Sequence, residues 1–172
     1  EYLEVVNMLL SQDVSSYQGK YYNLDGAVMS RRPIQNPRPP IMVAAMGPRM
    51  LRQAARHADI WNSMSFADNF ETQLEETRNR VARIDQLCAE FDRDPASLGR
   101  SYHMYDSTSR TSGGAIAYYE SEAAFEDMVS QVLETGMTDV GLYYPVLPEQ
   151  IATFERIATN TIPALKARFE SK

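Results

Sequence analysis

The sequence predicts an α/β fold in which about four βα units follow one another over residues 41–172. Short apolar segments alternate there with longer segments whose apolar residues recur every three or four positions. This is the order of strands and amphipathic helices in a parallel α/β protein. The segment IMVAAM at 41–46 has no polar residue, as is typical of a strand buried on both faces. Four such units make half of a (β/α)8 barrel.

The first unit joins the apolar segment to a helix through Gly47. Pro48 suits the first turn of that helix, because the N–H that proline lacks would have no partner there. The apolar residues that follow recur with helical spacing and predict one buried face. The residues expected on this face are Met50, Leu51, Ala54, Ala55 and Ala58.

The other three units repeat this order. The second begins with ADIWNSM at 58–64, the third with SYHMYDS at 101–107 and the fourth with DVGLYYP at 139–145. Gly136 is placed to end the third helix, and the final helix is expected to kink or restart near Pro163. The long second helix is expected to bury Phe66, Phe70, Leu74, Val81, Ile84, Cys88 and Phe91.

Residues 1–40 precede these units within a predicted single domain of residues 1–172. They read as a helix end, a short hairpin in which Asp25-Gly26 forms a turn, and the extended Pro-rich lead-in RRPIQNPRPP. The chain starts at Glu1 rather than Met, which suggests an incomplete or processed protein. A half-barrel has open strand edges, so we expect either a fragment or completion by self-association, as in a homo-oligomer.

Composition argues against several classes of partner. The net charge is -6 and only three lysines are present, whereas nucleic acids and anionic lipids require clustered basic residues. The longest apolar run is far shorter than a membrane span. The single cysteine, Cys88, cannot form an intrachain disulfide and has no metal-ligand spacing around it. We therefore expect a cytoplasmic protein that acts on a small molecule, with no nucleic acid, membrane or metal partner.

The junction MVAAMGPRML carries the strongest chemical signal. Amides in the first turn of a helix have no internal partner and lie at the positive end of the dipole, so they stabilise an anion. Gly47 allows close approach of a phosphate, and Arg49 could add a charge-assisted hydrogen bond. The alternative from the residues alone is a tight βα turn without a ligand.

The string PRPPIMVAAMGPRMLRQAARHADIWN resembles the luciferase-like flavin-dependent monooxygenase superfamily. The segments GKYYNLDGAV, RDPASLGRS, TGMTDVGLYYP and FERIATNTIPALKA resemble the same family in the same order. The resemblance implies the C-terminal half of a (β/α)8 barrel that uses FMN or, alternatively, the deazaflavin F-420. It implies a cofactor-phosphate site at Ala45, Met46, Gly47, Pro48 and Arg49.

Several further residues have both a functional and a structural interpretation. Trp61 and Asn62 end the second strand and are candidates for the cofactor pocket; the alternatives are packing for Trp61 and a turn or cap for Asn62. His103 could act as an acid or base, or be a structural or exposed histidine. Tyr143 and Tyr144 take opposite faces of the fourth strand, so one of them should point into the barrel.

The resulting hypothesis is a flavin-dependent oxidoreductase that uses a reduced cofactor for oxygen activation or for hydride transfer to a small organic substrate. No catalytic residue is assigned, since the missing strands would carry much of the active site. Asp59 is expected to be structural, and His57 is expected at the surface near a helix end. The alternative is a non-catalytic or truncated half-barrel that self-associates without a complete active site.

Overall fold

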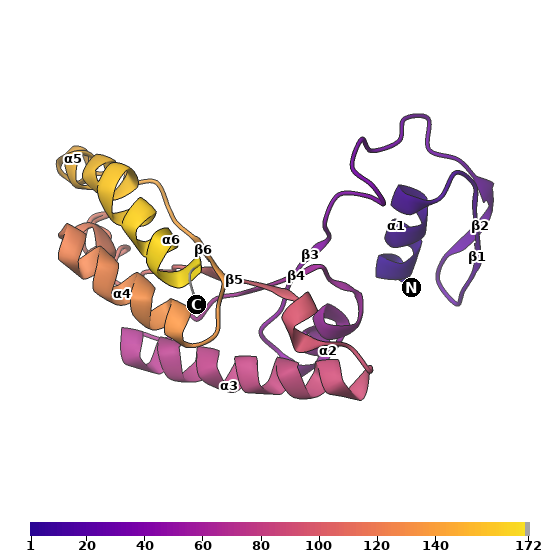
Figure 1. The fold of residues 1–172 in the computed structure, drawn as a ribbon, viewed down its shortest axis with the longest axis horizontal. Helices are drawn as coiled ribbons and strands as arrows, with labels where there is room; N and C mark the ends of the chain where they lie inside the picture. The colour runs from indigo at the N-terminus through magenta and orange to yellow at the C-terminus, as the bar shows by residue number, and fades with distance from the viewer. Residues whose placement is uncertain (171–172) are drawn as a thin grey trace.

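A computed structural model of the protein describes residues 1–170 and contains a four-stranded parallel sheet in the order β3-β4-β5-β6 (Figure 1). The strands are β3 (Met42–Ala44), β4 (Ile60–Ser63), β5 (Gly99–His103) and β6 (Asp139–Gly141). The helices that follow them are α2 (Pro48–His57), α3 (Phe70–Glu90), α4 (Glu122–Glu134) and α5 (Pro148–Arg156). The prediction of an α/β fold with four consecutive βα units is confirmed.

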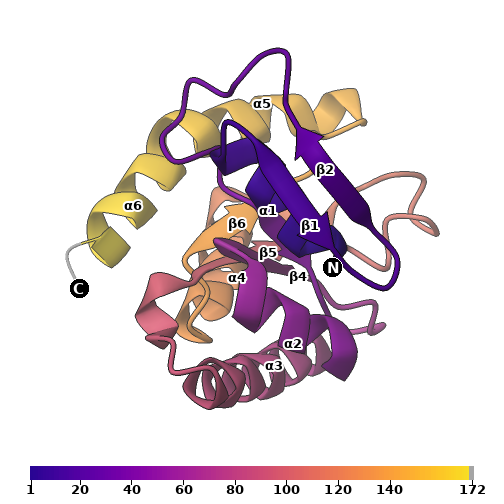
Figure 2. The same cartoon turned by 90° about the vertical axis from the view of Figure 1, so that its right-hand side faces the viewer.

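The helices curve around the outer side of the sheet. In Figure 2, α2 and α3 lie below the strands and α5 lies above them, continued by α6 (Ile162–Glu170). The sheet has only four strands, so β3 and β6 are open edges within residues 1–170. None of the helices in this part of the chain combines the length and apolar character that a membrane crossing requires.

The core lies between the sheet and these helices. Val43, Trp61 and Tyr102 point to the helix side and are buried. On the opposite face Met42 is 54% exposed, because no element within residues 1–170 covers that side of β3. Each fully buried large apolar side chain contributes about 1.5–3 kcal/mol to folding. The helix residues in the same core cluster include Leu51, Ala54, Ala55, Ile84, Leu87, Cys88, Phe125, Val129 and Val132.

Strand register places particular side chains in one row. Ala44 pairs with Asn62, Asn62 with Ser101, and Ser101 with Asp139. In a parallel sheet, paired residues point to the same face. These four residues therefore lie side by side on the face that the helices leave open.

The first forty residues form a separate group of elements, which stands apart from the sheet in Figure 1. They comprise α1 (Tyr2–Ser11) and an antiparallel hairpin of β1 (Ser15–Gln18) and β2 (Asn23–Ala27). The hairpin was predicted, but its turn was not. Asp25 and Gly26 lie inside β2 where the register shifts, and Gly26 has φ +59°, so they form a bulge in the strand rather than the turn.

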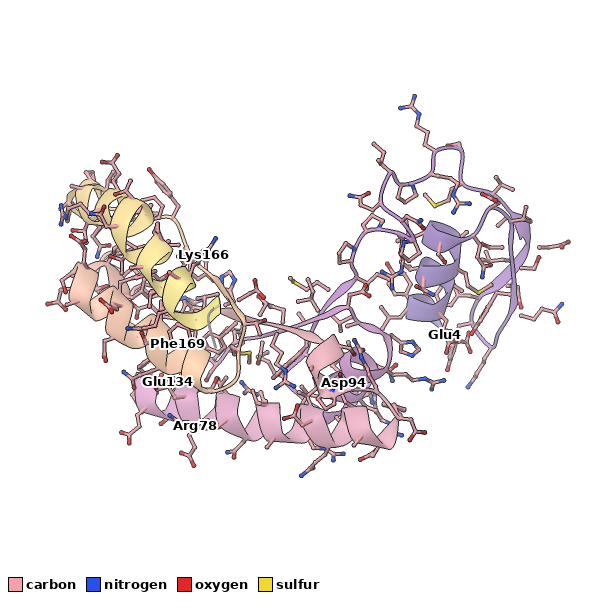
Figure 3. The ribbon with its side chains drawn as sticks, in the orientation of Figure 1. Glu4, Arg78, Asp94, Glu134, Lys166 and Phe169 are labelled. Atoms are coloured by element: carbon pink, nitrogen blue, oxygen red, sulfur yellow. The ribbon has the colours of Figure 1, made fainter. Side chains whose placement is uncertain are left out.

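Helix α3 begins later than its apolar pattern predicted. The side chain of Asn69 accepts a 2.9 Å hydrogen bond from the Thr72 amide and caps the helix, as is typical of asparagine at this position. Phe66 thus lies in the preceding loop, 57% exposed, with its ring 5.1 Å from that of Tyr105. The outer face of α3 is solvated, and Arg78 points away from the sheet (Figure 3).

Other boundaries also differ from the predicted ones. Met50 is 43% exposed, so it does not belong to the inner face of α2. Strand β5 is shifted toward the N-terminus, and β6 ends before the two tyrosines expected in it. A π-helical segment at Ile157–Thr161 separates α5 from α6, just before Pro163. This confirms the expected interruption, since proline cannot donate the helical hydrogen bond at its own position.

Candidate functional site

The turn between β3 and α2 contains backbone amides without a hydrogen-bond acceptor within residues 1–170. Gly47 is the N-cap with extended backbone, and Pro48 occupies the first helical position, as predicted. The cap has no side chain, and the amides of Arg49 and Met50 find no acceptor within residues 1–170. A Cβ built on Gly47 would meet no atom within 4 Å. The turn therefore offers open space, free donors and the positive end of a helix dipole, which fits a phosphate group.

This turn is held by the neighbouring strand. The Ala45 amide donates a 2.9 Å hydrogen bond to the carbonyl of Asn62, and the indole Nε1–H of Trp61 donates a 2.8 Å hydrogen bond to the Ala45 carbonyl. Trp61 is completely buried on the helix side of the sheet. The Trp61 side chain therefore packs in the core, as in the structural interpretation, and its hydrogen bond to Ala45 holds the turn from the helix side of the sheet.

Asn62 points to the open face instead. Its Nδ2 donates a 3.0 Å hydrogen bond to Ser101 Oγ on the next strand. This bond fixes the orientation of the Asn62 side-chain amide. Asn62 lies on β4, the strand beside β3, which leads into the turn. Arg49 is exposed and forms no ion pair with an acidic residue within residues 1–170, so its guanidinium can reach an anion at the start of α2.

A second group of residues gathers where β5 and β6 end. The rings of His103 and Tyr143 meet edge to face at 4.6 Å between centroids. Behind them, the hydroxyl of Tyr119 donates a 2.7 Å hydrogen bond to the Tyr143 carbonyl. The Tyr118 hydroxyl accepts from the Tyr143 amide and donates to the Met104 carbonyl, at 3.3 and 3.4 Å.

The sequence did not predict the role of Tyr118 and Tyr119, which hold the backbone of Tyr143 through hydrogen bonds. They lie in a single 3-10 turn, Ala117–Tyr119, in the connection between β5 and α4. The signal available was two adjacent aromatic residues in an otherwise small and polar stretch. Burial raises the pKa of Tyr119 to about 12 and raises that of Tyr118 as well, so both hydroxyls stay protonated as donors.

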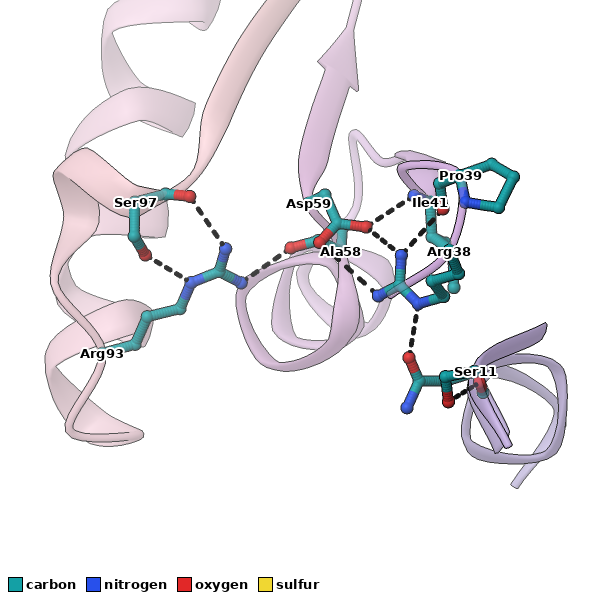
Figure 4. Close-up of polar contacts among 9 residues, drawn as sticks. Ser11, Arg38, Pro39, Ile41, Ala58, Asp59, Arg93 and Ser97 are labelled. Atoms are coloured by element: carbon teal, nitrogen blue, oxygen red, sulfur yellow. Dashed lines mark hydrogen bonds and ion pairs between the residues drawn. The ribbon is translucent and has the colours of Figure 1, made fainter. Parts of the chain in front are cut away.

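The opposite end of the sheet has an ion-paired cluster (Figure 4). Arg38 Nη1 donates to Asp59 Oδ2 at 2.5 Å, and the same oxygen accepts from the Ile41 amide at 2.6 Å. Partial burial raises the pKa of Asp59, but the hydrogen bonds from Arg38 and Ile41 and the charges of Arg38 and Arg93 outweigh it, and the net pKa is lowered. The cluster ties the lead-in to the start of β4, so Asp59 is structural, as predicted.

An open cleft of about 560 Å³ lies beside this cluster, between α1 and the end of α2. His57, the last residue of α2, lines it and is partly buried. Burial, with the charge of Arg56, lowers the pKa of His57, opposite to the effect of a helix C-terminus. Arg38 and Arg93 also line the cleft, but both already bond to protein acceptors. Ligands of parallel α/β sheets bind at the other, carboxyl, end of the strands.

Comparisons with known proteins show relatives of this fold. The model of the luciferase-like monooxygenase family matches residues 1–156, whereas no curated protein matches significantly. Coenzyme F420-dependent tetrahydromethanopterin reductase from Methanopyrus kandleri has a TM-score of 0.72 at 18% identity, covering 94% of this chain and 61% of its own. The long-chain alkane monooxygenase LadA gives 0.68 at 15%, covering 97% and 55%.

Riboflavin lyase RcaE, solved with modified FMN and riboflavin, is also similar, with a TM-score of 0.66 at 11% identity over 97% of this chain and 56% of its own. The chain thus spans 55 to 61% of these solved chains, and its fold is a partial barrel. Because the family model covers residues 1–156, which is most of the chain, the chain belongs to the luciferase-like monooxygenase family.

Proposed function

We propose that this protein is a flavin-dependent oxidoreductase which holds the phosphate of its cofactor at the turn between β3 and α2. The observation that carries the proposal is the pair of unpartnered amides, Arg49 and Met50, beside the open space at Gly47. Membership of the luciferase-like family supports a flavin-type ligand for this turn.

The proposed cofactor site consists of residues with different roles. Gly47 leaves room for the phosphate, the first turn after Pro48 supplies amide donors, and Arg49 supplies a positive charge. Asn62 borders the site on the open face, and Trp61 positions the turn through its bond to the Ala45 carbonyl. The remaining proposed cofactor-binding residues are Ala45 and Met46.

We propose FMN as the cofactor, with the deazaflavin F-420 as the alternative. Fold neighbours exist for both, since one is described as coenzyme F420 dependent and another was solved with modified FMN. When bound and reduced, such a cofactor supplies hydride or activates oxygen, while the protein supplies binding and orientation. The proposed substrate is a small organic molecule.

Calorimetric titration with FMN, F-420 and inorganic phosphate tests the proposal. We expect one of the two cofactors to bind and Arg49→Ala to weaken its affinity by roughly ten- to hundredfold, since a hydrogen bond to a charged group contributes about 1.5–3 kcal/mol. Arg31→Ala is the matched control, because it removes the same charge from the exposed lead-in. Failure of both cofactors to bind or to raise the unfolding temperature would contradict the proposal.

A specific observation also favours self-association. Strands β3 and β6 are both open edges, all four strands are parallel, and Met42 is exposed on the uncovered face. Pairing of each β6 with β3 of a second copy would produce eight parallel strands without a free edge. Light scattering after size-exclusion chromatography should then give twice the monomer mass. A stable, monodisperse monomer would contradict this association.

A further inference from the structure

We propose that the imidazole of His103 contacts the ring system of the bound cofactor and hydrogen-bonds to it. This inference rests on the proposed function and extends it to the other end of the ligand. It assigns a contact to a residue that lies across the sheet from the phosphate turn, at the carboxyl end of β5.

The first support is the face on which His103 lies. Along β5, Ser101 and His103 alternate with Tyr102, which packs on the helix side, so both point to the opposite face. On that face Ser101 is buried and His103 is partly exposed. Ser101 is in register with Asn62, which in turn pairs with Ala44 just before the phosphate turn. His103 therefore shares an open surface with the proposed cofactor site.

The second support is reach. Strand β5 lies two strands away from β3, and two strand spacings amount to roughly 10 Å. His103 is at the same carboxyl end of the sheet as Gly47. A ligand with a phosphate at one end and a ring at the other, joined by a short chain, can contact both positions across the face of β4.

The third support is that neighbouring residues hold the imidazole ring in place while its nitrogens remain without hydrogen-bond partners in residues 1–170. Its ring is flanked by that of Tyr143, and a Cβ on Gly141 would come within 3.2 Å of His103 Nδ1, so the glycine leaves the space that the ring occupies over β6. The Met104 amide donates a 2.9 Å hydrogen bond to the Gly141 carbonyl and fixes the strand end. Neither ring nitrogen of His103 has a hydrogen-bond partner in the described chain, residues 1–170.

The fourth support is the scaffold behind the pair. Buried Tyr118 and Tyr119 fix the backbone of Tyr143, and Tyr118 also bonds to the Met104 carbonyl. A partly exposed aromatic pair on such a rigid support is preorganised for a planar ligand, because little side-chain freedom is lost when the ligand binds.

Nuclear magnetic resonance tests the contact directly, since the chain has two histidines. The variants His57→Gln and His103→Gln assign the two imidazole signals. We expect saturating FMN, or F-420 if that is the cofactor that binds, to shift the His103 signals and leave those of His57 unchanged, because His57 lies at the opposite end of the sheet. We also expect His103→Gln to weaken cofactor affinity about fivefold, as for one net hydrogen bond of about 1 kcal/mol, and His57→Gln to leave it unchanged.

The outcomes separate this inference from the one on which it rests. Cofactor binding that depends on Arg49 but leaves the His103 signals unmoved would overturn the contact and retain the phosphate site. Binding of neither cofactor would overturn both. If His103→Gln fails to fold, the signal shift in the wild-type protein still decides, with assignment by His57→Gln alone.

Discussion

The indole of Trp61 donates its hydrogen bond to the carbonyl of Ala45, so a fully buried side chain on β4 holds the turn in which the phosphate is proposed to bind. Through this bond, the packing of Trp61 in the core determines the position of the turn. Trp61 is the second residue of β4 and faces the helices rather than the open side of the sheet.

Trp61→Phe should test this coupling. The substitution leaves the buried Ala45 carbonyl without its donor, which costs about 1–3 kcal/mol, and it removes part of a filled core position. We expect a lower free energy of unfolding, measured by urea titration with circular dichroism, and a weaker affinity for the cofactor. A variant with wild-type stability would show that the hydrogen bond contributes nothing to the fold.

Asp59→Asn should change the response to acid. The pKa of Asp59 is lowered in the folded protein, so its stabilising effect is present above the unfolded value of about 4 and is lost as the pH falls through the lower folded value. Because the carboxylate is partly exposed, we expect a loss of only about 1 kcal/mol at pH 7. Urea titrations from pH 7 to pH 3 should show a flatter acid dependence for the variant.

A matched control for this variant is Glu75→Gln, on the exposed part of α3. This change should leave both the stability at pH 7 and its acid dependence close to those of the wild type. Equal behaviour of the two variants would show that the Arg38 cluster does not stabilise the lead-in.

Tyr119→Phe should test the hydrogen bond by which Tyr119 holds the backbone of Tyr143. We expect a loss of about 1 kcal/mol, because a buried hydrogen bond to the Tyr143 carbonyl disappears. The wild-type pKa is raised to about 12, so the protonated tyrosine stabilises fully below the unfolded value of about 10. That contribution declines as the pH rises toward 12. If the free energy of unfolding changes with alkaline pH identically in wild type and variant, this hydrogen bond does not stabilise the fold.

Gly136→Ala should destabilise the end of α4. Gly136 has φ +98°, a conformation that alanine adopts poorly, and an added Cβ would lie 3.3 Å from Val81 Cγ1 on α3. We expect a loss of about 1–2 kcal/mol by thermal or urea unfolding. Gly136→Asn is the informative comparison, since asparagine tolerates positive φ better, and equal losses would assign the effect to the Val81 contact.

The alternation of apolar segments along the chain was sufficient to predict the α/β class, the four βα units and the start of α2 at Pro48. These features depend on local backbone preferences and on hydrophobic periodicity, both of which are written in neighbouring residues. The boundaries were less accurate. Asn69 caps α3 and leaves Phe66 in a loop, because a local hydrogen bond overrides the helical spacing of apolar residues.

Tertiary structure decided which face each candidate occupies. Periodicity shows that Trp61 and Asn62 point in opposite directions, but only the packed helices determine that Trp61 is the buried one. The sequence alone predicted that a helix begins directly after an apolar strand at Gly47, and the structure shows that the first amides of this helix have no acceptor within residues 1–170. That His103 and Tyr143 meet, with buried tyrosines behind them, depends on the register between β5 and β6 and on contacts between residues about 25 to 40 positions apart, and no local pattern encodes such contacts.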